Sequence, residues 1–222
     1  MRVSAEGAFS PVMKNQLRQL LAERALGTGR KITLSTGRES TFYFNCKPVT
    51  LSSDGASLVA DAFLEKLKLL PQPITAVGGR TLGADPIIGA MMMRALERGQ
   101  HLEGFYVREK QKAHGTKERI ANAPPSGTRV VIVDDVVTTG GSVLEAVDAA
   151  QDAGCIVVGV ITLVDRQEEG GAERISARVP HYYAIYTSHD FPEIAEAGQW
   201  DSTNSDASSN IRGDSTLTTS GQ

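Results

Sequence analysis

Short apolar runs rich in β-branched residues alternate in this chain with stretches of helical periodicity. The strand-like runs lie at 74–77, 104–107, 129–133, 156–164 and 182–186, and the helical patterns lie at 11–26, 52–70, 86–97 and 142–153. Parallel strands need a long crossover between them, usually a helix, so this alternation predicts βαβ units. The run 156–164 is apolar almost throughout, which is typical of a parallel strand buried on both faces. The sequence therefore predicts an α/β fold in which helices flank a central parallel sheet.

The N-terminal part of the chain departs from this alternation. Ser10-Pro11 predicts a helix start, because serine is a good N-cap and proline suits the first helical position. The strand-like pieces 32–34 and 41–44 flank turn residues and predict a hairpin. We therefore expect a small N-terminal hairpin or hood over about residues 10–50, within a single domain that covers residues 1–200.

The final segment, residues 201–222, has a different composition from the rest of the chain. Ser, Thr, Asn, Asp and Gly dominate it, and apolar residues are rare. Such a segment buries too little surface to offset the entropy that ordering costs. We expect it to be a disordered tail.

Composition limits the partners of this 222-residue chain. The formal net charge is −3, so no global basic field attracts nucleic acid, and any anion site must be local. The N-terminus lacks the apolar core of a signal peptide, and no apolar run approaches a membrane span, so a cytoplasmic protein with no membrane partner is expected. Cys46 and Cys155 match no zinc spacing and are expected to be reduced.

The segment from Val130 to Ser142 carries the clearest chemical signal. An apolar run ends in Asp134 and Asp135, and a turn rich in threonine and glycine leads into the next predicted helix. Ligands of parallel sheets bind beyond the carboxyl ends of the strands. Carboxylates suit sugar hydroxyls, and the free N–H groups of a turn before a helix suit a phosphate. The segment therefore predicts a sugar-phosphate site, with a plain capped connection as the structural alternative.

Two common phosphate-binding motifs do not match this turn. No lysine follows its glycines, as a P-loop requires, and the Gly-x-Gly-x-x-Gly dinucleotide pattern is absent from it. The segment instead resembles the 5-phosphoribosyl 1-diphosphate (PRPP) signature of type I phosphoribosyltransferases, an apolar strand followed by two acids and a Thr/Gly turn. That resemblance implies the fold of this family, but the signature does not identify the base.

The resemblance also assigns roles within the segment. It implies that Asp134 and Asp135 bind the 2′- and 3′-hydroxyls of the ribose, and that the turn from Thr138 to Ser142 binds the 5′-phosphate. The PRPP-binding residues implied here are Asp134, Asp135, Val136, Val137, Thr138, Thr139, Gly140, Gly141 and Ser142.

A cationic loop follows the run 104–107 and reads Arg108-Glu-Lys-Gln-Lys-Ala-His-Gly115. Such a loop on its own is usually solvated, but beside a diphosphate site its cations suit a departing pyrophosphate. Its order resembles the mobile catalytic loop of orotate phosphoribosyltransferases. The resemblance implies that the loop 108–119 reaches the neighbouring site of a homodimer. It implies PRPP binding by Arg108, Lys110, Lys112 and His114, and catalytic roles for Arg108, Lys112 and His114.

Three further segments are similar to the same family. Asp165-Arg166-Gln-Glu168 implies that Arg166 binds the carboxylate of orotate, which the two-pronged guanidinium suits; a structural Asp–Arg pair is the alternative. The hairpin 33–45 implies that its aromatic residues cover the base, although hydrophobic packing explains them equally well. The segment from Val77 to Pro86 resembles the loop that contacts pyrophosphate, with a Gly-Gly turn that binds no ligand as the alternative. The orotate-binding residues implied are Thr138, Arg166 and Phe44.

The chain also departs from the family pattern. Ser35 and Leu82 stand where many orotate enzymes carry lysine, and Glu109 replaces a lysine that often follows the arginine of the catalytic loop. The form of residues 78–86, Gly-Gly-Arg-Thr-Leu-Gly-Ala-Asp-Pro, resembles a recognised subgroup of the same family, so we interpret these differences as variation.

Together the resemblances imply transfer of the 5-phosphoribosyl group from PRPP to orotate, giving orotidine 5′-phosphate and pyrophosphate in pyrimidine synthesis. They imply Mg²⁺ as the cofactor, carried by PRPP without a direct protein ligand, with contact through Asp134 and Asp135 as the alternative. A phosphoribosyltransferase for a purine or uracil is one alternative. A PRPP-binding regulator without catalysis is another, and the net charge of −3 argues against one that binds nucleic acid.

Overall fold

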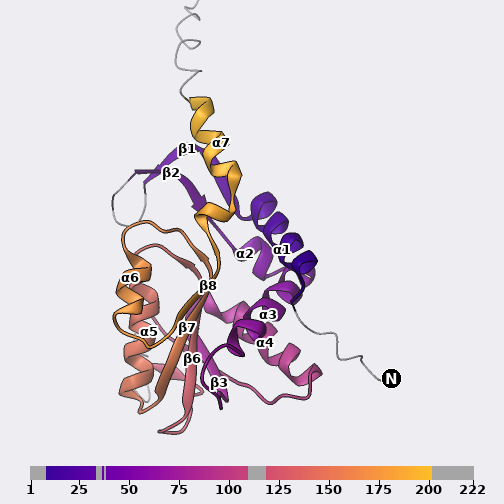
Figure 1. Cartoon of the computed structure of the whole chain (residues 1–222). Coiled ribbons are helices and arrows are strands. Elements are labelled where there is room, and N and C mark those ends of the chain that lie inside the picture. The colour runs from indigo at the N-terminus through magenta and orange to yellow at the C-terminus, as the bar shows by residue number, and fades with distance from the viewer. Residues whose placement is uncertain (1–8, 34–36, 38, 110–118, 202–222) are drawn as a thin grey trace, which may run out of the picture.

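The computed structural model describes residues 9–33, 37, 39–109 and 119–201 (Figure 1). A six-stranded sheet forms its centre. In spatial order the strands are β5 (Ile120–Ala121), β4 (Glu103–Val107), β3 (Ala76–Arg80), β6 (Arg129–Val137), β7 (Ile156–Asp165) and β8 (Tyr182–Thr187). All neighbouring pairs are parallel except β4 and β5, which pair antiparallel. The predicted central parallel sheet is confirmed.

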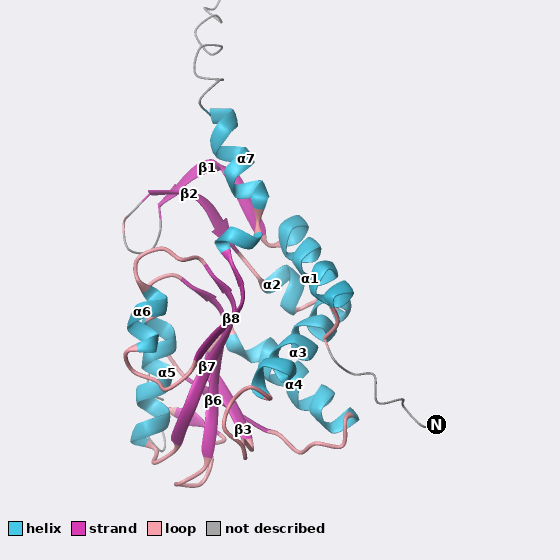
Figure 2. Ribbon diagram, in the orientation of Figure 1, coloured by secondary structure: helices cyan, strands magenta, loops and turns pink. Residues whose placement is uncertain are grey.

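Helices cover both faces of this sheet (Figure 2). The first face carries α3 (Ser53–Leu67) and α4 (Ala84–Glu97), and the second carries α5 (Gly141–Asp152) and α6 (Gly171–Ser176). On β6, Val131 and Val133 pack with the first layer, while Val130 and Ile132 pack with the second. Because both faces of the strand are buried, its residues are apolar in succession and do not alternate with polar ones.

A smaller unit lies beside the carboxyl ends of β6 and β7 (Figure 1). It contains α1 (Pro11–Arg24), the antiparallel hairpin of β1 (Leu26–Thr33) and β2 (Glu39–Phe44), and α2 (Lys47–Thr50). The C-terminal helix α7 (Pro192–Asp201) packs along this hairpin. The rings of Phe44 and Phe191 lie edge to face with centroids 4.9 Å apart. The predicted N-terminal hood is therefore completed by a helix from the other end of the folded chain.

Local side-chain chemistry starts the helices where the sequence predicts. Ser10 Oγ accepts a hydrogen bond from the N–H of Met13 at 3.3 Å, and Pro11 follows the cap. Ser52 Oγ likewise accepts from the N–H of Gly55 at 3.2 Å and caps α3. Each bond satisfies an N–H group that has no partner within its helix.

The structure also differs from the sequence prediction. The short elements β5, α2 and α6 were not predicted, because two to six residues show too little periodicity. The helix α7 was not predicted either, and it includes Asp201, the first residue of the predicted tail. Residues 202–222 lie outside the described residues, so the disordered tail stays a prediction. No helix in the described ranges is both long and apolar enough to cross a membrane.

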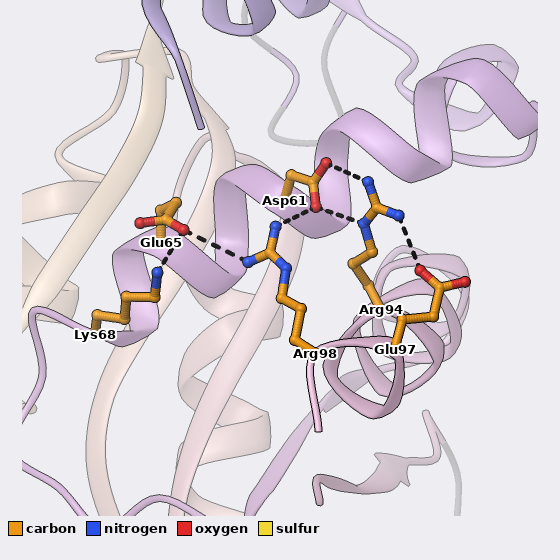
Figure 3. A network of polar contacts seen from close by, with 6 residues as sticks. All are labelled: Asp61, Glu65, Lys68, Arg94, Glu97 and Arg98. Carbon is orange, nitrogen blue, oxygen red and sulfur yellow. Dashed lines mark hydrogen bonds and ion pairs between the residues drawn. The ribbon is translucent and has the colours of Figure 1, made fainter. Parts of the chain in front are cut away.

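A buried carboxylate joins α3 to α4 (Figure 3). Asp61 on α3 is 1% exposed, and both of its oxygens accept hydrogen bonds from Arg94, at 2.7 and 2.9 Å. Arg98, the C-cap residue of α4, donates to the same carboxylate at 2.5 Å. Glu65, Lys68 and Glu97 extend the network toward solvent. The network ties together the two helices that cover the first face of the sheet.

Candidate active site

Two adjacent carboxylates lie near the end of β6. The predicted strand end at Val133 is wrong, because the ladder with β7 continues to the pair Val137–Asp165. Asp134 is 5% exposed, and its Oδ2 accepts a hydrogen bond from Ser142 Oγ at 3.0 Å. Its Oδ1 accepts the N–H of Asp135 at 3.0 Å. Asp134 is therefore held both by its own strand and by the first turn of α5.

Burial makes this acid pair hard to ionise. It raises the pKa of Asp134 to about 7, and the negative charge of Asp135 adds to this shift while the hydrogen bond from Ser142 opposes it. Burial also raises the pKa of the half-buried Asp135, and the charge of Lys47 opposes that shift. A ligand that donates hydroxyl hydrogens to these carboxylates would stabilise their charged forms.

The turn from Thr138 to Ser142 joins the acid pair to α5. Gly140, the N-cap residue of α5, adopts φ +76°, a left-handed conformation that glycine accepts readily, and it has no side chain with which to cap the helix. The N–H of Gly141 donates to Thr139 Oγ1 at 3.3 Å. The other N–H groups of the first turn have no partner within the helix, and they suit an anion. The structure thus places the predicted phosphate turn directly beside Asp134.

The loop after β3 lies against the same carboxylates. A Cβ atom built on Gly83 would lie 2.5 Å from Asp135 Oδ1 and 2.7 Å from Asp134 Oδ1, so only glycine fits there without a shift. The loop that the sequence assigns to pyrophosphate is therefore brought to the acid pair. Leu82, at the position of a lysine in many orotate enzymes, is 72% exposed.

Arg80 ends β3 between two glutamates. Its guanidinium lies 3.5 Å from Glu109 Oε1 and 3.6 Å from Glu145 Oε2, and its buried Nε–H has no hydrogen-bond partner among the described residues. Arg119 shares Glu145 at 3.2 Å. The structure thus places Arg80 within an ion-pair group, with one donor unused.

Only the two ends of the predicted catalytic loop are described. The N–H of Arg108 donates to the carbonyl of Arg119 at 2.9 Å, which holds these ends together. The Arg108 guanidinium lies 5.6 Å from the ring centre of Tyr106, and its Nε–H is buried without a hydrogen-bond partner in the described ranges. Lys110, Lys112 and His114 lie outside the described residues, so their predicted roles stay predictions.

Arg166 follows β7 and is 5% exposed. Its N–H donates to the carbonyl of Val137 at 3.0 Å, which fixes its backbone beside the phosphate turn. Its side chain reaches the hairpin, where Nη2 donates to Ser40 Oγ at 3.0 Å and to the Phe42 carbonyl at 2.8 Å. The guanidinium also pairs with Glu168 at 2.6 Å. Arg166 thus links the hood to the end of the sheet.

The aromatic residues of β2 divide between two faces. Phe42 and Phe44 are buried, whereas Tyr43 is 42% exposed. The Phe42 ring centre lies 4.8 Å from the Arg166 guanidinium. Phe44 is 9% exposed and packs against Phe191, within the hydrophobic core. The structure thus places Phe42 beside Arg166. Phe44, which the sequence predicts to contact orotate, packs in the hydrophobic core.

Sequence reasoning missed Lys47 at the start of α2. Its exposed side chain makes no ion pair or hydrogen bond in the part of the chain that the structure describes, yet its charge opposes the rise in the pKa of Asp135. No motif pointed to this lysine, because it is distant from the acid pair in sequence. The neighbouring Cys46 is fully buried, and burial holds the pKa of its thiol well above the usual range.

Comparison with known proteins agrees with this arrangement. A model of the phosphoribosyl transferase domain matches residues 88–184. The orotate phosphoribosyltransferase of Streptomyces avermitilis is 42% identical over 174 residues, which cover 78% of this chain and 93% of that protein. The chain belongs to the orotate phosphoribosyltransferase family. The family's enzyme from Thermosynechococcus vestitus is 43% identical over 169 residues, covering 76% of this chain and 87% of its own length.

Solved structures of the family share the fold. The Mycobacterium tuberculosis orotate phosphoribosyltransferase in complex with PRPP has a TM-score of 0.65 and 34% identity, and the match covers 80% of this chain and 98% of that one. The same enzyme with Fe(III) dicitrate has a TM-score of 0.68 and 36% identity over 80% of this chain and 98% of that one. The expected type I phosphoribosyltransferase fold and the expected family are thus confirmed.

Proposed function

We propose that this protein transfers the 5-phosphoribosyl group of PRPP to orotate, forming orotidine 5′-phosphate and pyrophosphate in pyrimidine synthesis. One observation carries the proposal. The backbone N–H of the buried Arg166 donates a hydrogen bond to the Val137 carbonyl at 3.0 Å. A residue suited to a carboxylate therefore lies beside the acid pair and the phosphate turn. Family membership supports the same reaction.

In this proposal each part of the site binds one part of the substrates. Asp134 and Asp135 accept hydrogen bonds from the ribose hydroxyls, and the turn Thr138–Ser142 binds the 5′-phosphate. Arg166 binds the carboxylate of orotate through two parallel hydrogen bonds. These contacts place the orotate ring nitrogen near the ribose C1 atom, which lowers the entropic part of the barrier.

The chemical step then exchanges two bonds at that carbon. The bond from C1 to pyrophosphate breaks as the bond from C1 to the orotate nitrogen forms, the bonding electrons leave with pyrophosphate, and the proton of the orotate N–H is released to solvent. Negative charge therefore grows on the leaving group. We assign Arg108, Lys110, Lys112 and His114 to its stabilisation, with Lys112 and His114 as the expected catalytic residues.

A divalent cation fits the donor set at β6. In the described part of the chain, no cluster of three or more acidic, histidine or cysteine side chains could hold a metal alone. Mg²⁺ is commonly bound by one or two carboxylates together with substrate phosphates, and Asp134 and Asp135 supply that number. Mg²⁺ held by these carboxylates and by PRPP would supply charge neutralisation at the pyrophosphate.

We also propose a homodimer in the cytoplasm, as the sequence analysis expects. The outer surface of α4 supports the dimer, because Met93 is 63% and Leu96 65% exposed one turn apart. Tyr106 on β4 is 40% exposed on the face of the sheet that α4 covers. Exposed apolar side chains on one face of a helix can form part of a surface that a second subunit covers. Arg108 lies two residues after Tyr106, so a partner at this surface would lie near the start of the catalytic loop.

The test of the reaction follows orotate absorbance in the presence of PRPP and Mg²⁺. We expect orotate to be consumed with release of pyrophosphate, and uracil and hypoxanthine to react far more slowly. Asp134→Asn should lower kcat/KM for PRPP by about 10²-fold or more, because the ribose loses a charged acceptor. Consumption of another base in preference to orotate would overturn the assignment.

A second assay tests the catalytic loop. Lys112→Ala should lower kcat by about 10²-fold, since a cation beside the departing pyrophosphate is lost. Lys66→Ala removes the same charge from α3 and should leave the rate unchanged. Near-normal kcat and KM in Lys112→Ala would refute the role of this lysine.

A further inference from the structure

The guanidinium of Arg166 has an uneven set of partners. Its Nη2 atom lies within reach of three acceptors: Ser40 Oγ at 3.0 Å, the Phe42 carbonyl at 2.8 Å and Glu168 Oε2 at 2.6 Å. One terminal guanidinium nitrogen carries only two N–H groups. Ser40 Oγ and the Phe42 carbonyl accept hydrogen bonds from this nitrogen, whereas Glu168 meets it only as an ion pair.

Another nitrogen of the same group is unused. The Nε–H of Arg166 is buried and has no hydrogen-bond partner among the described residues, although the side chain is only 5% exposed. Glu168 Oε2 is close enough to Arg166 for an ion pair, but it lacks the alignment of a hydrogen bond. A buried donor left unpaired is unfavourable, so the site is incomplete without a further acceptor.

The missing acceptor has a defined chemistry. An acceptor that satisfies Nε and Nη2 together must present two oxygens in one plane, as a carboxylate does. Glu168 provides a carboxylate but reaches only Nη2, because its other oxygen, Oε1, accepts from Ser40 Oγ at 3.2 Å. Glu168 therefore supplies the negative charge that Arg166 requires, but it does not bind the guanidinium through two parallel hydrogen bonds.

The loop that carries Glu168 holds it in this place. Gln167 and Glu169, on either side, have φ angles of +53° and +56°, which residues other than glycine seldom adopt. The N–H of Gln167 is bonded to the Asp165 carboxylate at 2.8 Å. The Glu168 side chain is 29% exposed, so it borders solvent into which it can turn.

We propose that Glu168 occupies, in the substrate-free protein, the place on Arg166 that the carboxylate of the acidic base takes, and that binding of the base displaces it. The inference rests on the proposed use of orotate. Glu168 neutralises Arg166 while the site is empty and competes with the incoming carboxylate. A base without a carboxylate leaves the Arg166–Glu168 pair intact, so Glu168 is a specificity-determining residue.

Two nucleotides isolate this contact, because orotidine 5′-monophosphate and uridine 5′-monophosphate differ only in the carboxylate. Calorimetric titration of both into the wild type and Glu168→Gln measures the competition. We expect Glu168→Gln to bind orotidine 5′-monophosphate about tenfold more tightly, which corresponds to roughly 1.4 kcal/mol. The affinity for uridine 5′-monophosphate should stay within about twofold, which also shows that the variant is folded.

Glu103→Gln is the matched control, because it removes the same charge at the start of β4, where His101 is its ion-pair partner among the residues that the structure describes. It should change neither affinity. If Glu168→Gln binds orotidine 5′-monophosphate no more tightly than the wild type does, or if both nucleotides shift equally, the displacement is refuted. Failure of the proposed function is a separate result, since the wild type would then not consume orotate with PRPP.

Discussion

Asp134 lies in an environment that differs strongly from that of a free carboxylate. Its burial opposes ionisation, whereas its proposed hydrogen bond to a ribose hydroxyl requires a charged acceptor. The folded protein therefore stores an unfavourable interaction that a bound sugar relieves. Such strain is common in binding sites and has a measurable dependence on pH.

The free energy of unfolding should depend on the protonation of the Asp134 carboxylate. The folded-state pKa of Asp134 is about 7, above its unfolded value of 3.8, so the folded state binds more protons between these values. This contribution to stability is present below pH 4 and is lost as pH rises through 7. Urea unfolding measures the free energy of unfolding of both proteins. As pH rises from 4 to 8, this free energy should increase for Asp134→Asn by a few kcal/mol relative to the wild type. A stability difference independent of pH would contradict the assignment.

Gly83 should be the glycine least tolerant of substitution beside the acid pair. In Gly83→Ala the new methyl group would displace both carboxylates, and we expect KM for PRPP to rise about tenfold or more. Gly89→Ala on α4 is the control, because a Cβ there meets no atom within 4 Å. It should keep KM and stabilise the helix by about 0.5–1 kcal/mol. Steady-state kinetics and thermal unfolding of both variants check this contrast.

At the scale of elements, the contact between α3 and α4 contains one buried charge beside its apolar side chains (Figure 3). A buried carboxylate is stable only with its partners, and here two arginines supply them. Asp61→Ala leaves both arginines without that partner and should lower the free energy of unfolding by about 3–5 kcal/mol. Glu97→Ala, at the exposed end of the network, should cost less than about 1 kcal/mol. Urea denaturation measures both, and equal losses would contradict the difference in burial.

At the scale of the whole molecule, the proposed dimer would cover the exposed apolar side chains on the outer side of α4. Leu96→Glu should place a charge in the interface and convert the dimer to monomer, with activity falling about tenfold or more if the catalytic loop serves the neighbouring site. Leu69→Glu is the control, since Leu69 is 58% exposed after α3. Light scattering coupled to size exclusion gives the mass of each variant. A dimeric Leu96→Glu, or a monomeric wild type, would refute this interface.

Much of the fold was predictable because its signals are local. The run at 156–164 and the cap at Ser10 act within one strand or one helical turn, and the structure confirms them. The acid pair and its turn were found for the same reason, since they are contiguous. The strand end at Val133 was wrong because β6 is extended by its neighbour β7, and pairing between strands is not a local property.

The sequence by itself determined the order of strands and helices and the placing of Asp134, Asp135 and the Thr/Gly turn at one end of β6. These follow from periodicity and from residues adjacent in the chain. Only the tertiary structure decided which distant segments meet there. Gly83 closes on the carboxylates, and Arg166 joins Ser40 and Glu168, through contacts between residues far apart in sequence. Such contacts depend on how the packed elements fill space, which no window of sequence records.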